Sequence, residues 1–428
     1  MVALGRAAAR VLGGGCFLVG RDTRRSGPLL ETALSAGLAA EGVDVRRLGV
    51  LPTPGVAWLS AADGLPAAMI SASHNPFPDN GIKFFAAGGR KLPDEVETRL
   101  EAELDRLVHQ TAAAGDGREV PVGAAVGAVT DGIDDVGRYV EALVATVEGR
   151  RLDGLRVVVD CAHGAAVGIA PEVLRRLGAE VEVLHDRPDG TNINAGCGST
   201  HPEELQRVVV AMGADAGLAY DGDADRVLAV DHEGGLVDGD QILAMCAVDL
   251  RQRSRLRRDT VVATVMANLG FRLAMDEQGI AVVETTVGDR YVLEALEAED
   301  LSLGGEQSGH VIFHDLATTG DGILTGLLVL DLVHRSGRTL ADLAAASMTR
   351  LPQVLRNVQV GNRAGLDEAA GLWDEVKAVE DELGDQGRVV VRPSGTEPVV
   401  RVMVEAPTAE QADQAADRLC ATVEKVLR

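Results

Sequence analysis

The stretch ISASHNPFPDNGIKFF, residues 70–85, carries the strand-to-loop transition around which this chain is organised. The apolar run AAMI that ends at Ile70 predicts a buried strand, and the polar segment SASHNP after it predicts a loop. Open α/β sheets place their chemistry in loops at the carboxyl ends of strands. The loop and its exit carry a hydroxyl, an imidazole and an amine, on Ser73, His74 and Lys83. This set suits covalent catalysis, although the loop alone is also compatible with a plain turn and a solvated histidine.

Length and composition limit the class of protein. A chain of 428 residues is too long for one hydrophobic core and predicts about three domains. No long apolar span and no signal peptide is evident, so neither a membrane partner nor export is expected. Cysteines are scattered, odd in number and without a CxxC pair, which excludes an obvious zinc site or disulfide framework and predicts a cytoplasmic protein. They are Cys16, Cys161, Cys197, Cys246 and Cys420.

The net charge of −24 argues against nucleic acid as a partner, because a polyanion would be repelled. The same charge sets a condition on any anionic substrate. Such a substrate needs a local cluster of arginine, lysine or metal to overcome the field of the whole protein.

Alternating strand and helix patterns predict the domain organisation. Three strand–helix series in succession indicate three similar doubly wound α/β domains, and the C-terminal segment predicts a smaller α+β domain. A helix is expected over Val2 to Leu12, and an irregular excursion over Ala112 to Gly127. The expected domains are residues 1–134, 135–237, 238–350 and 351–428.

The loop DGDADR follows the predicted strand that ends at Tyr220 and brings Asp221, Asp223 and Asp225 together. Three carboxylates this close repel one another unless a cation lies among them. An EF-hand would need Gly and Glu where Arg226 and His232 stand, so that calcium motif is excluded. An all-oxygen set with open positions fits Mg²⁺ that also binds phosphate oxygens, the alternative being a solvated acidic turn.

Two further loops are rich in polar groups. RPSGTEP combines hydroxyls, glycine N–H groups and guanidinium groups, which a phosphate dianion requires, although a plain Ser-Gly turn is an equal alternative for this loop alone. It lacks the Walker A spacing. GGEQSGH offers a carboxylate, an amide and a hydroxyl that can bracket sugar hydroxyls or an amine, but by itself it is weak evidence. The candidate phosphate-binding residues are Arg392, Ser394, Gly395, Thr396 and Arg401, and the candidate sugar-binding residues are Glu306, Gln307, Ser308 and His310.

The four loops SASHNP, DGDADR, GEQSGH and RPSGTEP, in this order, resemble the phosphoserine, magnesium, sugar and phosphate loops of the α-D-phosphohexomutase superfamily. The resemblance covers essentially the whole chain. Within the superfamily the chain is most similar to the bacterial phosphoglucosamine mutases. The stretches that carry this similarity are NINAGCGSTHPE (192–203), VMANLGF (265–271), TTVGDRYV (285–292) and GGEQSGH with its Gln307.

The resemblance implies four domains around a central cleft and the interconversion of glucosamine 6-phosphate and glucosamine 1-phosphate through glucosamine 1,6-bisphosphate. It implies that phosphorylated Ser73 is the phosphoryl donor, that Ser73 and the three aspartates hold one Mg²⁺ per subunit, and that Lys83, ten residues after Ser73, is the general acid/base. His74 and Arg226 would steady the transferring phosphoryl group. A hexose 1,6-bisphosphate is expected as activator, and the chain is expected to be a monomer or a homodimer.

One family feature is not found. Members open with a strand and a loop of the type FGTDGxRG before the helix that here starts at Val2, and this sequence has no such stretch. Two explanations are open: a truncated start, which we favour because the other loops are intact, or a short form with impaired activity.

Two alternatives to a phosphoglucosamine mutase follow from the sequence. One is a phosphoglucomutase or phosphomannomutase, which a comparison of glucosamine, glucose and mannose phosphates would separate. The other is a sugar-phosphate-binding paralogue that binds the bisphosphate without turnover. The intact Ser73, Lys83 and aspartates count against the second.

Overall fold

The computed structural model describes residues 1–109, 121–361, 365–366, 368–393 and 399–427. Its chain forms two compact units, the first of residues 1–265 and 282–344 and the second of residues 266–281 and 345–428. Among the described residues, no helix is both long and apolar enough to cross a membrane.

The first sheet is mixed and has six strands. They are β1 (Cys16–Arg21), β2 (Asp44–Val50), β3 (Ala67–Ile70), β4 (Ile82–Ala86), β5 (Arg90–Lys91) and β6 (Val129–Asp131). Their order is β5-β4-β3-β1-β2-β6, with β1 parallel to β2 and β3, and β4 antiparallel to β3. The helices of this part are α1 (Val2–Leu12), α2 (Gly27–Ala40), α3 (Thr53–Asp63) and α4 (Asp94–His109).

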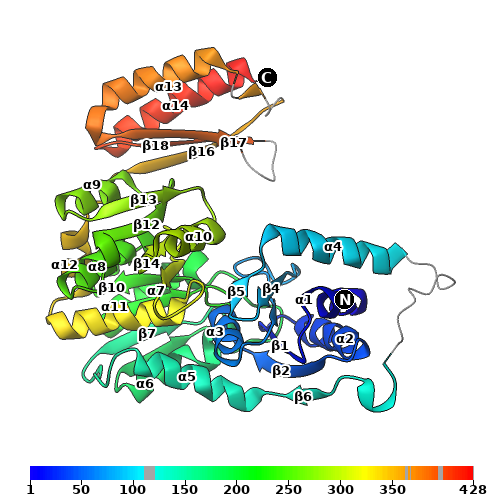
Figure 1. The fold of residues 1–428 in the computed structure, drawn as a ribbon. Helices are drawn as coiled ribbons and strands as arrows, with labels where there is room; N and C mark the ends of the chain where they lie inside the picture. The colour runs from blue at the N-terminus through cyan, green and yellow to red at the C-terminus, as the bar shows by residue number, and fades with distance from the viewer. Residues whose placement is uncertain (110–120, 362–364, 367, 394–398, 428) are drawn as a thin grey trace. The chain divides into compact units, whose positions relative to one another are not determined.

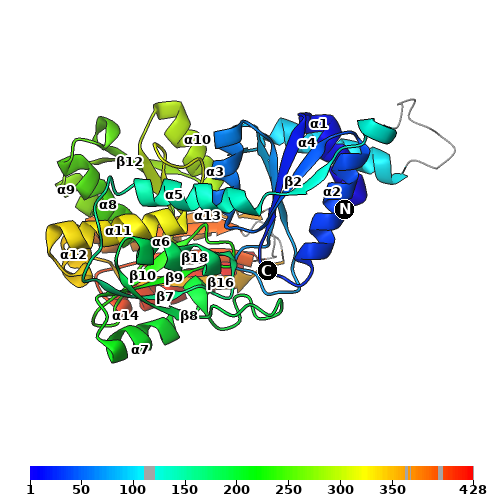
Figure 2. The same ribbon diagram turned by 90° about the horizontal axis from the view of Figure 1, so that it is seen from below.

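Helices cover both faces of this sheet. Figure 2 shows α3 on one side and α1, α2 and α4 on the other. Alternate strand residues serve the two faces, as the period of a strand requires. Phe17 and Val19 join the core beneath α1, α2 and α4, whereas Gly20 leaves room for Val56 of α3.

The second and third sheets repeat the central part of the first. The second has β7 (Arg156–Asp160), β8 (Glu180–Leu184), β9 (Ala216–Tyr220), β10 (Val227–Asp231) and β11 (Leu236–Val237), with helices α5 (Val136–Ala145), α6 (Ala170–Arg176) and α7 (Glu203–Met212). The third has β12 (Thr260–Thr264), β13 (Ala281–Thr285), β14 (Leu303–Gly305) and β15 (Val311–Phe313), with helices α8 (Gly239–Gln252), α10 (Asp289–Glu299), α11 (Gly322–Ser336) and α12 (Leu340–Ser347). Their orders are β11-β10-β9-β7-β8 and β13-β12-β14-β15.

All three sheets share one feature that positions the site. The third strand of each repeat (β3, β9 or β14) is parallel to its neighbour and is followed by an antiparallel strand (β4, β10 or β15) beside it. The connections in these hairpins are residues 71–81, 221–226 and 306–310. These connections contain three of the four loops that the sequence singles out.

The second unit contains a three-stranded antiparallel sheet. Its strands are β16 (Gln353–Gln359), β17 (Arg388–Pro393) and β18 (Val399–Glu405), in the order β16-β18-β17, and its helices are α9 (Leu269–Glu277), α13 (Ala370–Leu383) and α14 (Ala409–Val426). Figure 1 shows α13 and α14 on one face of this sheet. Their apolar side chains, such as Leu372 and Leu419, form a core with Val400, Val402 and Val404 of β18.

The predicted α/β class and the helix over Val2–Leu12 are confirmed. The antiparallel strand in each repeat and the helix α3 were not predicted. Both follow from tertiary context. A short strand after a polar loop pairs back on its neighbour, and a helix with buried Thr53, Pro54 and Gly55 shows little amphipathic pattern. Most of the irregular segment expected over Ala112 to Gly127 lies outside the described residues.

Candidate active site

The first two hairpin loops of the first unit meet at the side chain of Ser73, and the third packs beside the aspartate loop. Its Oγ donates a hydrogen bond of 2.7 Å to Asp221 Oδ2, across 148 residues of sequence. The same hydroxyl lies 3.3 Å from Nδ1 of His74, which is exposed. The phosphoserine and magnesium loops expected from sequence are therefore adjacent in the structure.

The three aspartates of the second loop are buried, at 1%, 0% and 3% exposure for Asp221, Asp223 and Asp225. Burial, reinforced by the charges of the other two carboxylates, raises the pKa of Asp221 well above its ordinary value. For Asp225, burial is outweighed by the positive Lys83 beside it, and the pKa is held well below its ordinary value. Burial therefore disfavours the anionic form of Asp221, whereas the positive charge of Lys83 stabilises the anionic form of Asp225.

Lys83, on β4, reaches into this cluster. Its Nζ donates to Asp223 Oδ2 at 2.8 Å and to Asp225 Oδ2 at 3.1 Å. Burial opposes the charge of the amine, but the two carboxylates raise the pKa of Lys83 above its ordinary value. The lysine expected as an acid/base group thus lies in the same place as the nucleophile and the aspartates.

Two oxygen atoms test whether the cluster fits a metal ion. Asp223 Oδ1 and Asp225 Oδ1 are buried, and among the described residues neither has a hydrogen-bond partner. Carboxylate oxygens of Asp221, Asp223 and Asp225 lie within 4.8 Å of one another. Buried anionic oxygens without donors are unfavourable unless a cation satisfies them, so these residues fit a hard divalent ion.

Arg226 and His74 lie beside the cluster. Arg226 Nη1 is 3.1 Å from His74 Nδ1, and its Nε is 3.8 Å from Asp225 Oδ1. Partial desolvation of the ring and the neighbouring Arg226 charge lower the pKa of His74, which favours the neutral imidazole near pH 7. A guanidinium and a neutral imidazole next to Ser73 supply two groups that can contact an anionic oxygen.

The third loop places Glu306, Gln307 and Ser308 in partly or fully exposed positions. Glu306 Oε1 accepts from the N–H of Gly288 at 3.1 Å, and a Cβ at Gly309 would lie 2.1 Å from the carbonyl oxygen of Val227. The glycine lets this loop pack directly on β10, next to the aspartate loop.

His310 differs from the other predicted sugar contacts. Its side chain is 1% exposed, its Nε2 accepts from the N–H of Gly320 at 3.0 Å, and its Nδ1 lies 3.8 Å from Asp225 Oδ2. The buried ring therefore faces the aspartate cluster and not the solvent-accessible side of the loop.

The fourth loop belongs to the second unit. Arg392 and Arg401 are paired directly across β17 and β18. Burial and the neighbouring charge of Arg401 lower the pKa of Arg392. Two guanidinium groups at facing positions repel each other, which an anion between them would relieve. Ser394, Gly395 and Thr396 lie outside the described residues.

Two residues that the sequence did not single out also contact the site. Thr53, at the start of α3, donates from Oγ1 to Asp223 Oδ2 at 2.6 Å. Asp289, at the start of α10, lies 3.9 Å from His310 Nε2. A threonine in TPG carries no signal of its own, whereas Asp289 stands in the quoted stretch TTVGDRYV.

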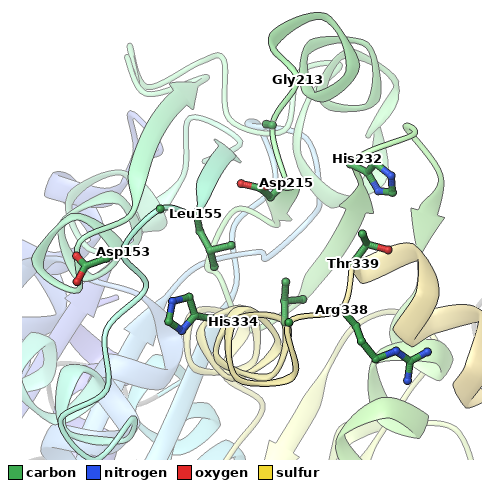
Figure 3. Close-up of a pocket in the computed structure, with 12 residues that line it drawn as sticks. Asp153, Leu155, Gly213, Asp215, His232, His334, Arg338 and Thr339 are labelled. Carbon is green, nitrogen blue, oxygen red and sulfur yellow. The ribbon is translucent and has the colours of Figure 1, made fainter.

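A cavity of the first unit lies away from these loops. It has a volume of about 490 Å³ and is lined by residues that include Asp153, Asp215, His232, His334 and Arg338 (Figure 3). None of its lining residues belongs to the three hairpin loops. This cavity is therefore separate from the candidate site, which is identified by the chemistry of its residues.

Comparison with known proteins identifies the family of this chain. Four family models match consecutive parts of the chain, all described as phosphoglucomutase/phosphomannomutase: α/β/α domain I over residues 1–110, domain II over 137–235, domain III over 238–351 and the C-terminal domain over 355–422. A phosphoglucosamine mutase of Thermobifida fusca is 57% identical over 407 residues, which cover 95% of this chain and 88% of the relative. The chain belongs to the phosphoglucosamine mutase family of phosphohexomutases.

Other members of the family and solved structures are also similar. A phosphoglucosamine mutase of Symbiobacterium thermophilum is 54% identical over 434 residues, covering 100% of this chain and 94% of the relative. The structure of a phosphoglucomutase/phosphomannomutase family protein from Burkholderia thailandensis matches with a TM-score of 0.80 at 27% identity, covering 99% of this chain and 93% of that one. These matches place the protein among enzymes that are isomerases acting by phosphoryl transfer.

Proposed function

We propose that this protein interconverts glucosamine 6-phosphate and glucosamine 1-phosphate. The observation that carries the proposal is the contact of Ser73 Oγ with Asp221 at 2.7 Å, with Lys83 bound to the other two aspartates of the same loop. Relatives named phosphoglucosamine mutase, 54–57% identical, support the choice of an amino-sugar phosphate as substrate.

In the proposed reaction, Ser73 carries the phosphoryl group at the start. The O1 hydroxyl of glucosamine 6-phosphate attacks the phosphorus and the bond from phosphorus to Ser73 Oγ breaks. The protonated Lys83 gives a proton to Ser73 Oγ as it takes up the proton of the hydroxyl. The product is glucosamine 1,6-bisphosphate. After this intermediate turns over in the site, Ser73 Oγ takes the phosphoryl group from O6, and Lys83 gives a proton to that oxygen as it takes up the proton of the serine hydroxyl. The phosphoserine is thereby restored.

We propose that Asp221, Asp223 and Asp225, together with the Ser73 phosphate, hold one Mg²⁺. The two buried aspartate oxygens without hydrogen-bond partners among the described residues support this assignment. When bound, the ion would offset the negative charge that develops on the transferring group. His74 and Arg226 would contact the oxygens of that group, since both lie beside Ser73.

The other two loops are proposed to hold the rest of the substrate. Glu306, Gln307 and Ser308 would bind the sugar, and His310 would orient Asp225 from behind. Arg392, Arg401 and the residues Ser394, Gly395 and Thr396 would hold the phosphate that does not react. Local positive charge at this loop meets the requirement that a net charge of −24 imposes on an anionic substrate.

The location and the activator are part of the same proposal. Five cysteines, all free, fit a cytoplasmic enzyme. A hexose 1,6-bisphosphate would activate the enzyme by phosphorylating Ser73 before the first turnover.

A coupled assay tests the proposal. The chain is incubated with glucosamine 6-phosphate, Mg²⁺ and a trace of glucose 1,6-bisphosphate, and glucosamine 1-phosphate is measured. Turnover that is faster than with glucose or mannose phosphates, and that Ser73→Ala abolishes, is expected. A preference for glucose or mannose phosphate would overturn the substrate, and bisphosphate binding without any turnover would support a paralogue that only binds.

A further inference from the structure

Arg24 is a charged residue with only 2% of its surface exposed, just after the carboxyl end of β1. Its Nε donates to Asp22 Oδ2 at 2.8 Å. Its Nη2 donates to the carbonyl oxygens of Ser73 at 3.0 Å and Asn75 at 2.9 Å, and its Nη1 donates to that of Pro76. The guanidinium is thus directed at three carbonyl groups of the loop that carries the nucleophile.

Asn194 holds two of the same carbonyl groups from the second sheet's side. It follows β8 in the chain, is 9% exposed, and its Nδ2 donates to Ser73 O at 2.9 Å and to Asn75 O at 3.1 Å. Its φ of 57° lies in the left-handed region, which asparagine tolerates better than most residues. Donors from two different sheets therefore converge on one short piece of backbone.

The aspartate loop packs against this same backbone. A Cβ at Gly222 would lie 2.6 Å from Ser73 O and 2.8 Å from Asn194 Nδ2. Ser73 itself has a φ of 50°, an uncommon conformation for a residue with a side chain, which persists only where the surroundings enforce it. The direction of Ser73 is thus set by contacts on its carbonyl group and not by the loop sequence alone.

We propose that Arg24 and Asn194 are positioning residues for Ser73, a pair we call the carbonyl clamp. By fixing the Ser73 and Asn75 carbonyls, they keep the hydroxyl of Ser73 within reach of Asp221. This inference rests on the proposed function, because it assigns the clamp a role in phosphoryl transfer.

The clamp acts through Ser73 and not through the substrate. Four of the five N–H groups of the Arg24 guanidinium are already bonded to Asp22 and the three carbonyls, which leaves little capacity for a phosphate. The Asp22–Arg24 ion pair is buried, and such pairs are weak evidence for a role in stability. Loss of the clamp is therefore expected to lower kcat and to leave KM nearly unchanged.

The test compares Asn194→Asp and Arg24→Lys with Arg25→Ala. Asn194→Asp keeps the size of the side chain and its tolerance of left-handed φ but removes both N–H donors. Arg24→Lys keeps the charge beside Asp22 but cannot reach three carbonyls. Arg25 is the matched control because it is the next residue and its side chain is exposed.

We expect kcat for glucosamine 6-phosphate to fall about 10- to 100-fold in the two clamp variants, with KM within about threefold of wild type, since small displacements of a reacting group cost rates of this size. Arg25→Ala should match wild type. Hydrogen exchange of the amides at 72–77 should be faster in Asn194→Asp than in Arg25→Ala, with equal thermal stability elsewhere.

Three results would overturn the clamp. One is wild-type kcat in a folded Asn194→Asp protein, another is a joint change of kcat, KM and melting temperature, which indicates general structural damage, and the third is unchanged amide exchange at 72–77. If Arg24→Lys does not fold, Asn194→Asp decides alone. If the wild-type chain turns over no hexose phosphate, the proposed function fails, and the amide exchange still decides whether the clamp holds the loop.

Discussion

The loops at 71–81 and 221–226 occupy the same place in two sheets with the same central strand order, yet their surroundings are opposite. In the first, residues 74–80 are exposed and the backbone is held through its carbonyl groups. In the second, all three aspartates are buried, and two of them form ion pairs with Lys83 or Arg226.

The difference shows that the fold topology sets the position of each loop, whereas the residues of the loop set its chemistry. The repeated hairpin brings each loop to the carboxyl edge of its sheet, where loops of neighbouring sheets can meet. What each loop contributes depends on its residues: a hydroxyl that must remain accessible in one, and anionic oxygens that must be desolvated in the other.

The largest expected effect is on the accessible loop. Ser73→Ala removes the proposed phosphoryl carrier, and activity should fall by at least about 10⁴-fold with the fold intact, since the side chain is partly exposed. A coupled assay and intact mass after incubation with glucose 1,6-bisphosphate measure this. Ser26→Ala, which removes a nearby hydroxyl bonded to Asn80, is the control, and its Ser73 should still be phosphorylated. Activity at the wild-type level in Ser73→Ala would show that Ser73 does not carry the phosphoryl group.

The second effect is on the buried loop. Asp223→Asn removes one of the oxygens without a hydrogen-bond partner among the described residues, and we expect about a 10³-fold loss of activity. Mg²⁺ at about 100 times its dissociation constant should stabilise the wild type by about 2.7 kcal/mol and this variant by far less. Asp231→Asn, at the other end of β10, should keep the Mg²⁺ response. Equal Mg²⁺ responses in Asp223→Asn and wild type would show that the ion lies elsewhere.

The contact between the two loops gives the third prediction. Gly222→Ala places a Cβ 2.6 Å from Ser73 O, so the loops must move apart, and kcat should fall about 10- to 100-fold. Gly137→Ala, on α5 with no atom within 4 Å of its Cβ, is the control and should be neutral or slightly stabilising. An active Gly222→Ala enzyme would mean that close packing of the loops is unnecessary.

A fourth prediction concerns the loop of the second unit. Arg392→Ala should raise KM for glucosamine 6-phosphate about 10- to 100-fold, because it removes one of two facing guanidinium groups. Stability should hardly change, since the variant also removes a like-charge contact. Arg356→Ala, on β16 of the same sheet and paired with Asp413, should leave KM unchanged. A change in kcat alone would contradict a phosphate-binding role.

The smallest effect is on stability and concerns Asp321, a buried carboxylate that follows the third loop and caps α11. It accepts from the hydroxyl of Tyr139 at 2.7 Å, and burial raises its pKa from 3.8 to about 6. Because the folded pKa is higher than the unfolded one, its stabilising contribution is complete below about pH 4 and is lost as pH rises through 6.

Ionisation of Asp321 should lower the free energy of unfolding by about 3 kcal/mol. The Asp321→Asn side chain stays neutral. The stability of this variant relative to wild type should therefore rise between pH 4 and pH 7 by up to this amount. Urea unfolding of both proteins at the two pH values measures the difference. An equal pH response in both would place the titration on other carboxylates.

Local pattern was sufficient for much of this protein. Apolar runs that end in polar loops located β3 and β9, because a buried strand must be apolar and a loop at its end must be polar. Loop composition also identified Ser73, Lys83 and the three aspartates as candidates, since few residue types can serve as nucleophile, acid/base or magnesium ligand.

Other features depended on partners distant in sequence. Arg24 and Thr53 carry no local signal, and Asn194 stands in the quoted stretch NINAGCGSTHPE without any sign of its role. Each matters through a contact with a residue more than 45 positions away. His310 looked like a sugar contact within GGEQSGH, but packing turned its ring towards Asp225.

The sequence by itself determined which groups are present and at which strand ends they stand, because strand and loop formation depends on near neighbours. Only the tertiary structure decided which groups meet. The 2.7 Å contact of Ser73 with Asp221, the burial that raises the pKa of Asp221 and the Lys83 charge that lowers the pKa of Asp225 arise from sheets packing together. Distances and desolvation of this kind are properties of the folded chain and are not contained in any single segment.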